Sequence, residues 1–298
     1  MSKRARFEAI GRWAGEGEFS VRFMCQRLGV SESGYYRFRK RPKSAHDLRD
    51  EELGEKIVGI HEGQRGNPGT RCIRGCLAAE GQRVGRRRIG RIMRENGIVG
   101  RHVRAYKSTT DPDGGHTDIP DLIGRDFSTG TPDERWCGDI TYVKTASGWA
   151  YKAVVIDIGT RRPIGWAIDT HMREELVERA LAMALGRRGF PRDVIFHSDH
   201  GSVYTSRAFR RFCARHHVRQ SMGRTGVCWD NAVAESYFAS YKKELIHTRP
   251  WKDADEVRRE TFEWIEYYYS RVRRHSSLCY LTPVEFELGY RSVHELAA

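Results

Sequence analysis

The sequence predicts an α/β domain with one mixed sheet, preceded by an all-α part made of helix-turn-helix units. From residue 132 onwards, strand-like runs alternate with amphipathic segments in the order of three strands, a helix, a strand, a helix, a strand and a long helix. Before residue 108, apolar residues recur at helical spacing, and Gly or Ser residues separate the short segments. The chain of 298 residues is long enough for one large domain and one or two small ones.

The first helical unit is predicted over residues 1–45. Ser20 can cap one helix, Gly29 can supply the positive φ of a tight turn, and Ser31 can cap the next helix. This pattern is typical of a helix-turn-helix that lays its second helix in the DNA major groove, although a plain pair of antiparallel helices shares it. The basic residues predicted to contact DNA phosphates in this unit are Arg37, Arg39 and Lys40.

A second helix-turn-helix-like unit is predicted over residues 46–107. Its last helix is expected to stop at Asn96 and Gly97. That helix concentrates basic side chains that would repel one another without a polyanion, although a solvated basic face is the alternative. The residues predicted to contact DNA here are Arg86, Arg87, Arg88 and Arg91.

The distribution of charge supports a nucleic-acid partner for the helical part. Residues 1–110 contain 25 Lys and Arg against 12 Asp and Glu, whereas residues 111–298 contain 27 of each. The whole net charge of +13 therefore lies in the first third of the chain. An excess of this kind is typical of a segment that binds a polyanion, most often DNA.

The remaining composition excludes other classes of protein. No apolar run approaches the roughly 18 residues that a membrane span needs, and the first residues lack a secretory signal. The seven cysteines are irregularly spaced, which favours reduced thiols over disulfides. We therefore expect a cytoplasmic protein. Residues 108–131 are rich in Gly, Pro, Asp, Ser and Thr and are predicted to form a linker.

The α/β domain is predicted over residues 132–290. Its first three strands are expected to form an antiparallel meander, followed by helices and shorter strands. The order fits a ribonuclease-H-like domain. The predicted strands are 136–145, 149–157, 162–169, 193–199 and 219–222, and the predicted helices are 174–188, 206–217 and 231–246.

Three carboxylates in this domain lie at positions that favour chemistry. Asp139 is inside a predicted strand, where Asp is disfavoured, so its side chain must face water, a partner or a metal. Asp199 ends an otherwise apolar strand, and the carboxyl ends of strands are where α/β folds build sites. Glu235 begins the long helix, and Lys242 lies about two turns later on the same side.

This set of carboxylates suits a magnesium site. Mg²⁺ prefers oxygen ligands and keeps several waters. Two such ions about 3.5–4 Å apart can activate an attacking oxygen and stabilise a leaving oxygen in a phosphoryl displacement. We therefore predict Asp139, Asp199 and Glu235 as both the catalytic residues and the metal ligands.

The spacing and the local motifs resemble a known family. The 35 residues between Asp199 and Glu235 resemble the spacing in retroviral integrases and insertion-sequence transposases. Four motifs, taken in order, resemble the catalytic subunits of the insertion-sequence-three family. They are Trp-Cys-Gly-Asp-Ile-Thr-Tyr at 136–142, His-Ser-Asp-His-Gly-Ser-Val-Tyr-Thr-Ser at 197–206, Cys-Trp-Asp-Asn-Ala-Val-Ala-Glu-Ser at 228–236, and Arg-Arg-His-Ser-Ser-Leu at 273–278 followed by Leu-Thr-Pro at 281–283.

The resemblance implies a bacterial DNA transposase with a ribonuclease-H-like integrase core. Such an enzyme binds terminal inverted repeats, nicks the 3′ end and joins it to target DNA by transesterification, along a copy-out, paste-in route. It implies two Mg²⁺ ions, with Mn²⁺ as a substitute, held by Asp139, Asp199 and Glu235, and a phosphate contact from Lys242. The expected partners are DNA, at least one further copy of the chain, and a small companion protein from an upstream reading frame.

Residues next to the triad, and two other functional classes, stay open. We expect His197, His200, Trp229 and Asn231 to support the triad rather than to react, and the particular role of His200 stays open. Val203 stands where the family often has Gln, which puts a polar contact there in doubt. A non-catalytic helix-turn-helix regulator is the alternative function, and a ribonuclease acting on RNA–DNA hybrids is a third possibility.

Overall fold

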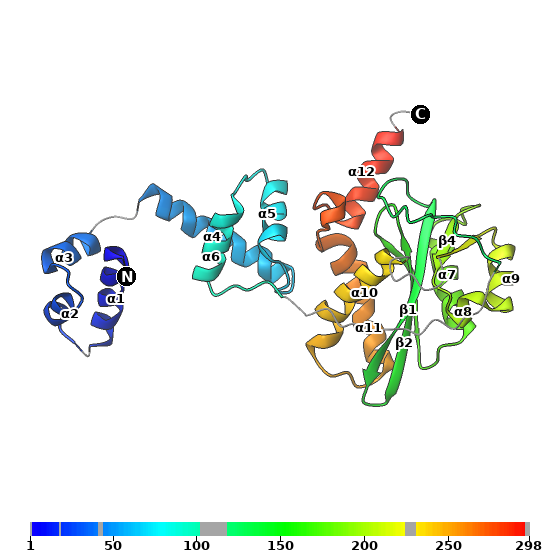
Figure 1. Cartoon of the computed structure of the whole chain (residues 1–298), viewed down its shortest axis with the longest axis horizontal. Coiled ribbons are helices and arrows are strands. Elements are labelled where there is room, and N and C mark those ends of the chain that lie inside the picture. The colour runs from blue at the N-terminus through cyan, green and yellow to red at the C-terminus, as the bar shows by residue number, and fades with distance from the viewer. Residues whose placement is uncertain (1, 18, 41–43, 102–117, 224–230, 296–298) are drawn as a thin grey trace. The chain divides into compact units, whose positions relative to one another are not determined.

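The computed structural model describes residues 2–17, 19–40, 44–101, 118–223 and 231–295 (Figure 1). Contacts divide the chain into one compact unit of residues 1–56 and a second of residues 57–298. The part of the predicted linker at 108–117 lies outside the described residues. Every helix in the described ranges is too short or too polar to span a bilayer.

The first unit contains three short helices, α1 (Lys3–Glu16), α2 (Val21–Arg27) and α3 (Glu32–Lys40). As the sequence predicts, the Ser20 hydroxyl accepts a hydrogen bond from the Phe23 amide at 3.3 Å. Gly29 has a φ of 61°, and the Ser31 hydroxyl accepts from the Gly34 amide. These caps and the turn set α3 against a small core of Phe7, Ile10, Met24, Cys25 and Tyr35.

The second group of helices comprises α4 (Ala45–Gly63), α5 (Thr70–Ala79) and α6 (Arg86–Glu95). The predicted stop is confirmed, because Asn96 follows the last helical residue and Gly97 has a φ of 66°. Side chains and backbone just after α4 contact the C-terminal part of the chain. The Tyr268 hydroxyl donates to the Gln64 carbonyl oxygen at 3.1 Å and accepts from the Asn67 amide group.

Within the described residues, five strands form one mixed sheet in the order β3-β2-β1-β4-β5. The strands are β1 (Arg135–Thr145), β2 (Gly148–Asp157), β3 (Pro163–Asp169), β4 (Ile195–Ser198) and β5 (Arg219–Met222). The first three are antiparallel, and β4 and β5 run parallel to β1. The predicted meander and mixed sheet are therefore confirmed.

Helices cover both faces of this sheet (Figure 1). One face packs against α10 (Ala232–Glu244), α11 (Ala254–Glu263) and the π-helical segment η2 (Trp264–Val272). The other packs against α7 (Glu174–Arg187), α8 (Ser202–Thr205) and α9 (Arg207–Arg215). The chain also forms η1 (Ile246–Thr248), η3 (Ser276–Leu278) and α12 (Pro283–Glu295). This three-layer arrangement is the ribonuclease-H-like fold that the sequence predicts.

Two predicted helices differ in extent from the observed ones. The helix expected over 206–217 is preceded by the four-residue α8, because Ser206 is extended and caps a new helix, its hydroxyl accepting from the Phe209 amide. The long helix expected over 231–246 ends at Glu244, where the chain bends into η1. Asp199 and Glu235 are both exposed and lie outside the apolar core.

One buried lysine between β2 and α10 was not predicted. Lys152 is fully buried, and its ammonium nitrogen donates to the Tyr237 hydroxyl at 2.7 Å. The nitrogen also lies 3.4 Å from the ring centre of Tyr241 and 5.8 Å from that of Trp264. Burial lowers the pKa of Lys152 well below its ordinary value. The folded chain therefore binds fewer protons here than the unfolded chain at pH values between this lowered pKa and about 10.5.

The double variant Lys152→Met, Tyr237→Phe is expected to be more stable than the native chain. The double variant removes a buried amine without leaving an unpaired hydroxyl, which at neutral pH should raise the free energy of unfolding by about 1 kcal/mol or more. This corresponds to roughly 2–4 °C in Tm for a unit of this size. Thermal unfolding should show the gain at pH 7 and a smaller gain near pH 10, where the unfolded lysine also loses its proton.

The single variant Tyr237→Phe is the control for this pair. It strips the lysine of a hydrogen-bond partner while keeping the ring, so it should lower Tm. A double variant that is less stable than the native chain would mean that the aromatic faces hold a charged ammonium favourably.

Candidate active site

Two of the predicted carboxylates lie at the edge where the parallel pairing of β1 and β4 ends. β1 and β4 pair in parallel over Arg135–Cys137 and Ile195–His197. Asp139 lies two residues beyond this pairing on β1, and Asp199 directly follows the end of β4. Both aspartates therefore lie where the β1–β4 pairing ends, beside the carboxyl end of β4, a position where α/β folds build their sites. β1 itself continues to Thr145.

Asp139 is the most perturbed carboxyl group at this edge. Its side chain is half-buried, and one carboxylate oxygen accepts a hydrogen bond from the Ile140 amide at 2.6 Å. Burial, and after it the negative charge of Asp199, raises the pKa of Asp139 to about 7, and the charge of Glu235 raises it further. Lys242 acts in the opposite direction. A buried carboxyl group surrounded by like charges is a frequent feature of functional sites.

Asp199 is exposed and begins a sharp turn. Its carboxylate accepts a hydrogen bond from the Gly201 amide at 3.0 Å, and α8 begins at the next residue. In this turn, the Nε2 atom of His200 donates a hydrogen bond to the Gly223 carbonyl oxygen at 2.6 Å. The hydrogen bond ties the turn after β4 to the residue following β5. His200 therefore holds backbone beside Asp199.

Glu235 lies on the first turn of α10, which is fastened to β1 beside Asp139. The Asn231 side-chain amide donates to the Gly138 carbonyl oxygen at 3.1 Å, and the Asn231 carbonyl accepts from the Glu235 amide. The Glu235 side chain is exposed, but partial burial of its carboxylate still raises its pKa. Asn231 thus links the helix that carries Glu235 to the strand that carries Asp139.

Lys242 lies farther along the same helix and close to the hairpin of β1 and β2. Its ammonium nitrogen is 5.4 Å from the ring centre of Tyr142. Its charge lowers the pKa of Asp139, which places a cation near the carboxylates. The predicted alignment of Glu235 and Lys242 along one helix agrees with the bounds of α10.

The three side chains have the donor chemistry of a divalent cation site, but they are not closed around one point. Among the described residues, no group of three His, Cys, Asp or Glu side chains is arranged to hold an ion as it stands. Asp139 and Asp199 each turn a carboxylate oxygen onto a neighbouring backbone amide. The mutual repulsion that raises the pKa of Asp139 is nevertheless the repulsion that a bound cation would relieve. The residues therefore fit a hard divalent cation by charge and by donor type.

The other residues of the motifs are packed around this edge. His197 is buried, and its Nδ1 is hydrogen-bonded to the Ser221 hydroxyl at 2.9 Å. Val203, on α8, is buried in the core, so its side chain makes apolar contacts there. Trp229 lies outside the described residues. These contacts favour supporting roles for His197 and Val203.

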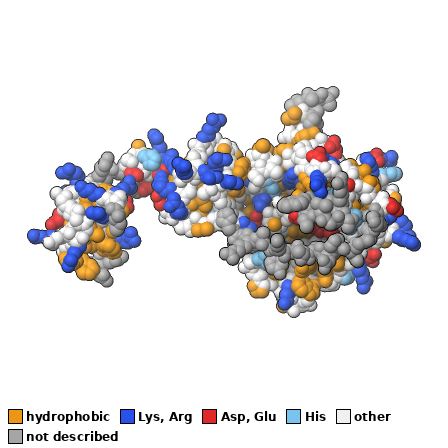
Figure 2. Space-filling view, in the orientation of Figure 1, with side chains coloured by type: hydrophobic (Ala, Val, Ile, Leu, Met, Phe, Trp, Pro, Cys, Tyr) orange, Lys and Arg blue, Asp and Glu red, His pale blue; other side chains and the backbone are white. Residues whose placement is uncertain are grey.

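The basic residues predicted to contact DNA lie on two separate helices. Arg37, Arg39 and Lys40 are exposed on α3 in the first unit. On α6, Arg86 and Arg87 are exposed, and Arg88 and Arg91 are half-buried. Arg91 pairs with Glu95 at 3.0 Å, so part of its charge is compensated within the helix. Figure 2 shows Lys and Arg side chains gathered over the N-terminal helices.

The aromatic and basic C-terminal segment is mostly packed. Trp264, Tyr268 and Tyr269 are buried, and the Arg273 guanidinium donates to the Glu244 carboxylate at 3.0 Å. These four residues therefore pack on the core rather than lie free on the surface. The exposed Tyr267 is an exception.

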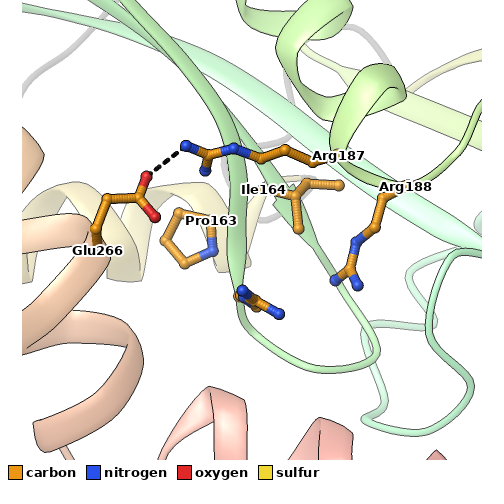
Figure 3. Close-up of a pocket in the computed structure, with 6 residues that line it drawn as sticks. Pro163, Ile164, Arg187, Arg188 and Glu266 are labelled. Atoms are coloured by element: carbon orange, nitrogen blue, oxygen red, sulfur yellow. Dashed lines mark ion pairs between the residues drawn. The ribbon is translucent and has the colours of Figure 1, made fainter.

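A separate pocket of about 270 Å³ lies at the start of β3, the end of α7 and η2 (Figure 3). Its charged groups are engaged with one another. Arg187 pairs with Glu266 at 2.8 Å, as Figure 3 shows, and Arg162 pairs with Glu287 of α12 at 3.0 Å. Arg188 also binds Glu287 and lies 3.0 Å from Asp133. This network fastens α12 to the sheet and contains none of the three predicted catalytic residues.

Comparison with known families finds matches both in the helical part before the sheet and in the domain that contains the sheet. An HTH-like domain matches residues 48–106, and two overlapping integrase core domain families match residues 130–228 and 216–283. The HTLV-2 integrase catalytic core domain in complex with magnesium is 16% identical and covers 52% of this chain and 97% of its own, with a TM-score of 0.40.

Curated bacterial relatives match over nearly the full length. Transposase InsF for insertion sequence IS3A of Escherichia coli K12 is 34% identical over 275 residues, which cover 91% of this chain and 95% of the relative. An uncharacterised 31 kDa protein of insertion element IS600 from Shigella sonnei is 35% identical over 92% of this chain and 100% of its own length. With a helix-turn-helix region, an integrase core and this extent of similarity, the chain belongs to the IS3 family of insertion-sequence transposases.

Proposed function

We propose that this transposase nicks the 3′ ends of its element and joins them to new DNA, with Asp139, Asp199 and Glu235 as its catalytic carboxylates. One observation carries the assignment. Two aspartates lie where the parallel pairing of β1 and β4 ends, Asp139 within β1 and Asp199 directly after β4, and Asn231 fastens the helix of Glu235 to β1 beside Asp139. The charge of Glu235 acts on Asp139 across this edge.

The three carboxylates would hold a divalent metal, with Mg²⁺ the preferred ion and Mn²⁺ a substitute, in a site for two ions. Bound metal supplies Lewis-acid stabilisation of the attacking and leaving oxygens. Asp139 contributes negative charge from within β1 and Asp199 from the turn after β4, and Glu235 brings the third carboxylate from α10. Asn231 acts as a positioning residue, because it holds the first turn of that helix against the Gly138 carbonyl.

The reaction needs no covalent intermediate with the protein. In the nicking step, a water oxygen forms a bond to phosphorus while the bond from phosphorus to the leaving 3′ oxygen breaks. In the joining step, the freed 3′-hydroxyl oxygen attacks a phosphorus of target DNA, and a target 3′ oxygen leaves. The attacking oxygen loses a proton and the leaving oxygen gains one. Lys242, placed near Asp139, would neutralise the phosphate beside the scissile bond.

Specific DNA binding would reside in the N-terminal helices. Exposed cations on α3 and α6 suit the phosphates that flank a major-groove contact to the terminal inverted repeats. Joining two element ends needs at least two protomers, so we propose a homo-oligomer assembled on DNA. A companion protein from an upstream reading frame and a copy-out, paste-in route complete the proposal.

The test is a nicking and joining assay on labelled duplexes that carry the terminal repeats flanking the gene. The full-length protein with Mg²⁺ or Mn²⁺ should release a 3′ end and join it to a second duplex, and EDTA should stop both steps. Tight, specific binding of the repeats without any nicking in either metal would favour the alternative of a non-catalytic regulator. Cleavage confined to the RNA strand of RNA–DNA hybrids would indicate a ribonuclease.

A further inference from the structure

The hairpin of β1 and β2 carries two aromatic side chains to which neither the motifs nor the proposed chemistry gives a role. Tyr142 is 57% exposed and Trp149 is 48% exposed. Their rings pair edge to face, with centres 5.3 Å apart. Large aromatic side chains at this exposure leave apolar area in water, which a ligand with a flat apolar face would cover.

The hairpin is held firmly, so these rings form a fixed surface. At its tip, the Ala146 amide donates to the Trp251 carbonyl oxygen at 2.9 Å, and the Ser147 amide donates to the Lys252 carbonyl oxygen at 3.1 Å. The Thr145 hydroxyl donates to the Gly148 carbonyl oxygen. A ligand would therefore meet rings that are already ordered, which reduces the entropy that binding must overcome.

Positive charge surrounds the two rings. The Lys242 ammonium nitrogen lies 5.4 Å from the Tyr142 ring centre, and Lys144 is exposed directly opposite Trp149 in the β1–β2 register. Lys252 follows at the anchored tip and is exposed. Aromatic rings interleaved with cations are the composition of surfaces that stack nucleobases and bind the adjacent phosphates. The charge therefore favours a DNA strand over an apolar protein segment as the occupant.

The distance to the proposed active site matches the length of a few nucleotides. Tyr142 follows Asp139 by three residues on β1, so their backbone positions are about 10 Å apart and their side chains leave opposite faces of the strand. That length corresponds to about three nucleotides of one DNA strand. Lys242 connects the two places, since its charge acts on Asp139 and its nitrogen lies at the Tyr142 ring.

We propose that Tyr142 and Trp149 form a stacking platform for an unpaired nucleobase of the DNA strand that flanks the scissile phosphate. The proposal rests on the proposed strand-transfer function and adds a base contact to it. Lys242 and Lys144 bind the phosphates on either side of the stacked base. Stacking tolerates any base, so the platform fixes the position of the strand rather than its sequence.

The probe is a terminal-repeat duplex with three unpaired nucleotides at the cleavage end, one of them 2-aminopurine. The full-length protein should quench the 2-aminopurine fluorescence. Tyr142→Ala and Trp149→Ala should abolish the quenching and weaken binding of this probe roughly 5- to 150-fold. Tyr142→Phe keeps the ring and should behave like the native chain. Phe190→Ala, at an aromatic side chain that is 59% exposed elsewhere in the domain, is the matched control.

An abasic version of the probe tests whether the loss is due to stacking. Without the base, the native chain and Tyr142→Ala should bind with the same affinity. Unchanged quenching in both alanine variants would overturn the platform. So would a shift of their oligomeric state in the absence of DNA, because it would assign the rings to contacts with a second copy of the chain.

Joining is measured on the same DNA, which separates this proposal from the strand-transfer proposal. A native chain that quenches the probe but joins nothing would leave the platform standing and remove the catalytic function. A native chain that joins, beside alanine variants that join and quench equally well, would remove the platform alone.

Discussion

Asp139→Asn is expected to abolish nicking and joining while specific DNA binding survives. The substitution keeps the size of the side chain but removes a negatively charged oxygen ligand at the edge between β1 and β4. Metal stabilisation of a phosphoryl transition state contributes several kcal/mol, so the rate should fall by about 10³-fold or more. Single-turnover joining of labelled repeats measures the loss, and gel-shift titration measures the binding.

Thermal unfolding of the same variant separates lost chemistry from lost structure. Asp139 is half-buried, and partial loss of solvent and the charge of Asp199 both disfavour its charged form, so a neutral side chain there should leave Tm unchanged or raise it. Retained joining by a folded Asp139→Asn protein would remove Asp139 from the metal site.

Among the variants proposed for this chain, Arg188→Met is expected to cause the largest fall in the free energy of unfolding. The Arg188 and Glu287 side chains are each 5% exposed, and Asp157, 3.8 Å from the same guanidinium, is fully buried. Removing one partner from a buried ion pair typically costs about 3–5 kcal/mol. Glu287 keeps Arg162, whereas the buried Asp157 loses its nearest cation, so we expect a loss near the lower end of this range. At 2–4 °C per kcal/mol, Tm should fall by roughly 6 °C or more. Calorimetry or circular dichroism of the full chain measures this change.

Lowering the pH should reduce the difference in the free energy of unfolding between the native chain and Arg188→Met. Burial alone would raise the pKa of Glu287, but hydrogen bonds and the positive charge from Arg188 and then Arg162 outweigh it and lower the pKa to about 2. A carboxyl group with a lowered pKa stabilises the fold above its unfolded pKa of 4.5, and the contribution is lost as pH falls towards about 2. The gap in stability between the two proteins should close across this range.

Arg187→Met is the matched control, since Arg187 pairs with the partly exposed Glu266. An ion pair of that kind contributes less than about 1 kcal/mol. An equal fall in Tm for Arg188→Met and Arg187→Met would show that the buried network stabilises the fold no more than the exposed ion pair does.

Much of the α/β domain could be predicted because its strands and helices carry strong local patterns. The last strand, β5, has the predicted bounds. The apolar residues that recur at helical spacing near the long helix, Val233, Tyr237, Tyr241 and Leu245, are all buried. Capping residues also carry local information, as Ser20 shows. Patterns of this kind depend on neighbours within a few residues, so one sequence is enough to reveal them.

Features that depend on distant partners could not be predicted. Lys152 resembles a solvent-facing residue in the sequence, and only the packing of Tyr237, Tyr241 and Trp264 shows that it is enclosed. Arg273 donates to the carboxylate of Glu244, 29 residues away, a partner that no local pattern indicates.

At the candidate site, the sequence predicts which carboxylates lie on which elements, but not how they are held. The hydrogen bond from Asn231 to Gly138 spans 93 residues, and the bond from His200 to Gly223 fixes the turn after Asp199. Both contacts depend on the way β1, β4 and β5 meet. The exposure of Tyr142 and Trp149 likewise follows from the hairpin geometry rather than from residue type.

The most direct test of the proposed triad is single-turnover joining of labelled element ends by Asp139→Asn, Asp199→Asn and Glu235→Gln, measured side by side. Asp193→Asn is the control, because Asp193 is exposed and its positive φ of 63° suits Asn equally well. If the three carboxylates act together, each triad variant should lose joining by about 10³-fold or more in Mg²⁺ while binding DNA normally, and the control should join like the native chain. Joining at the native rate by any one of the three folded variants would contradict the proposed triad.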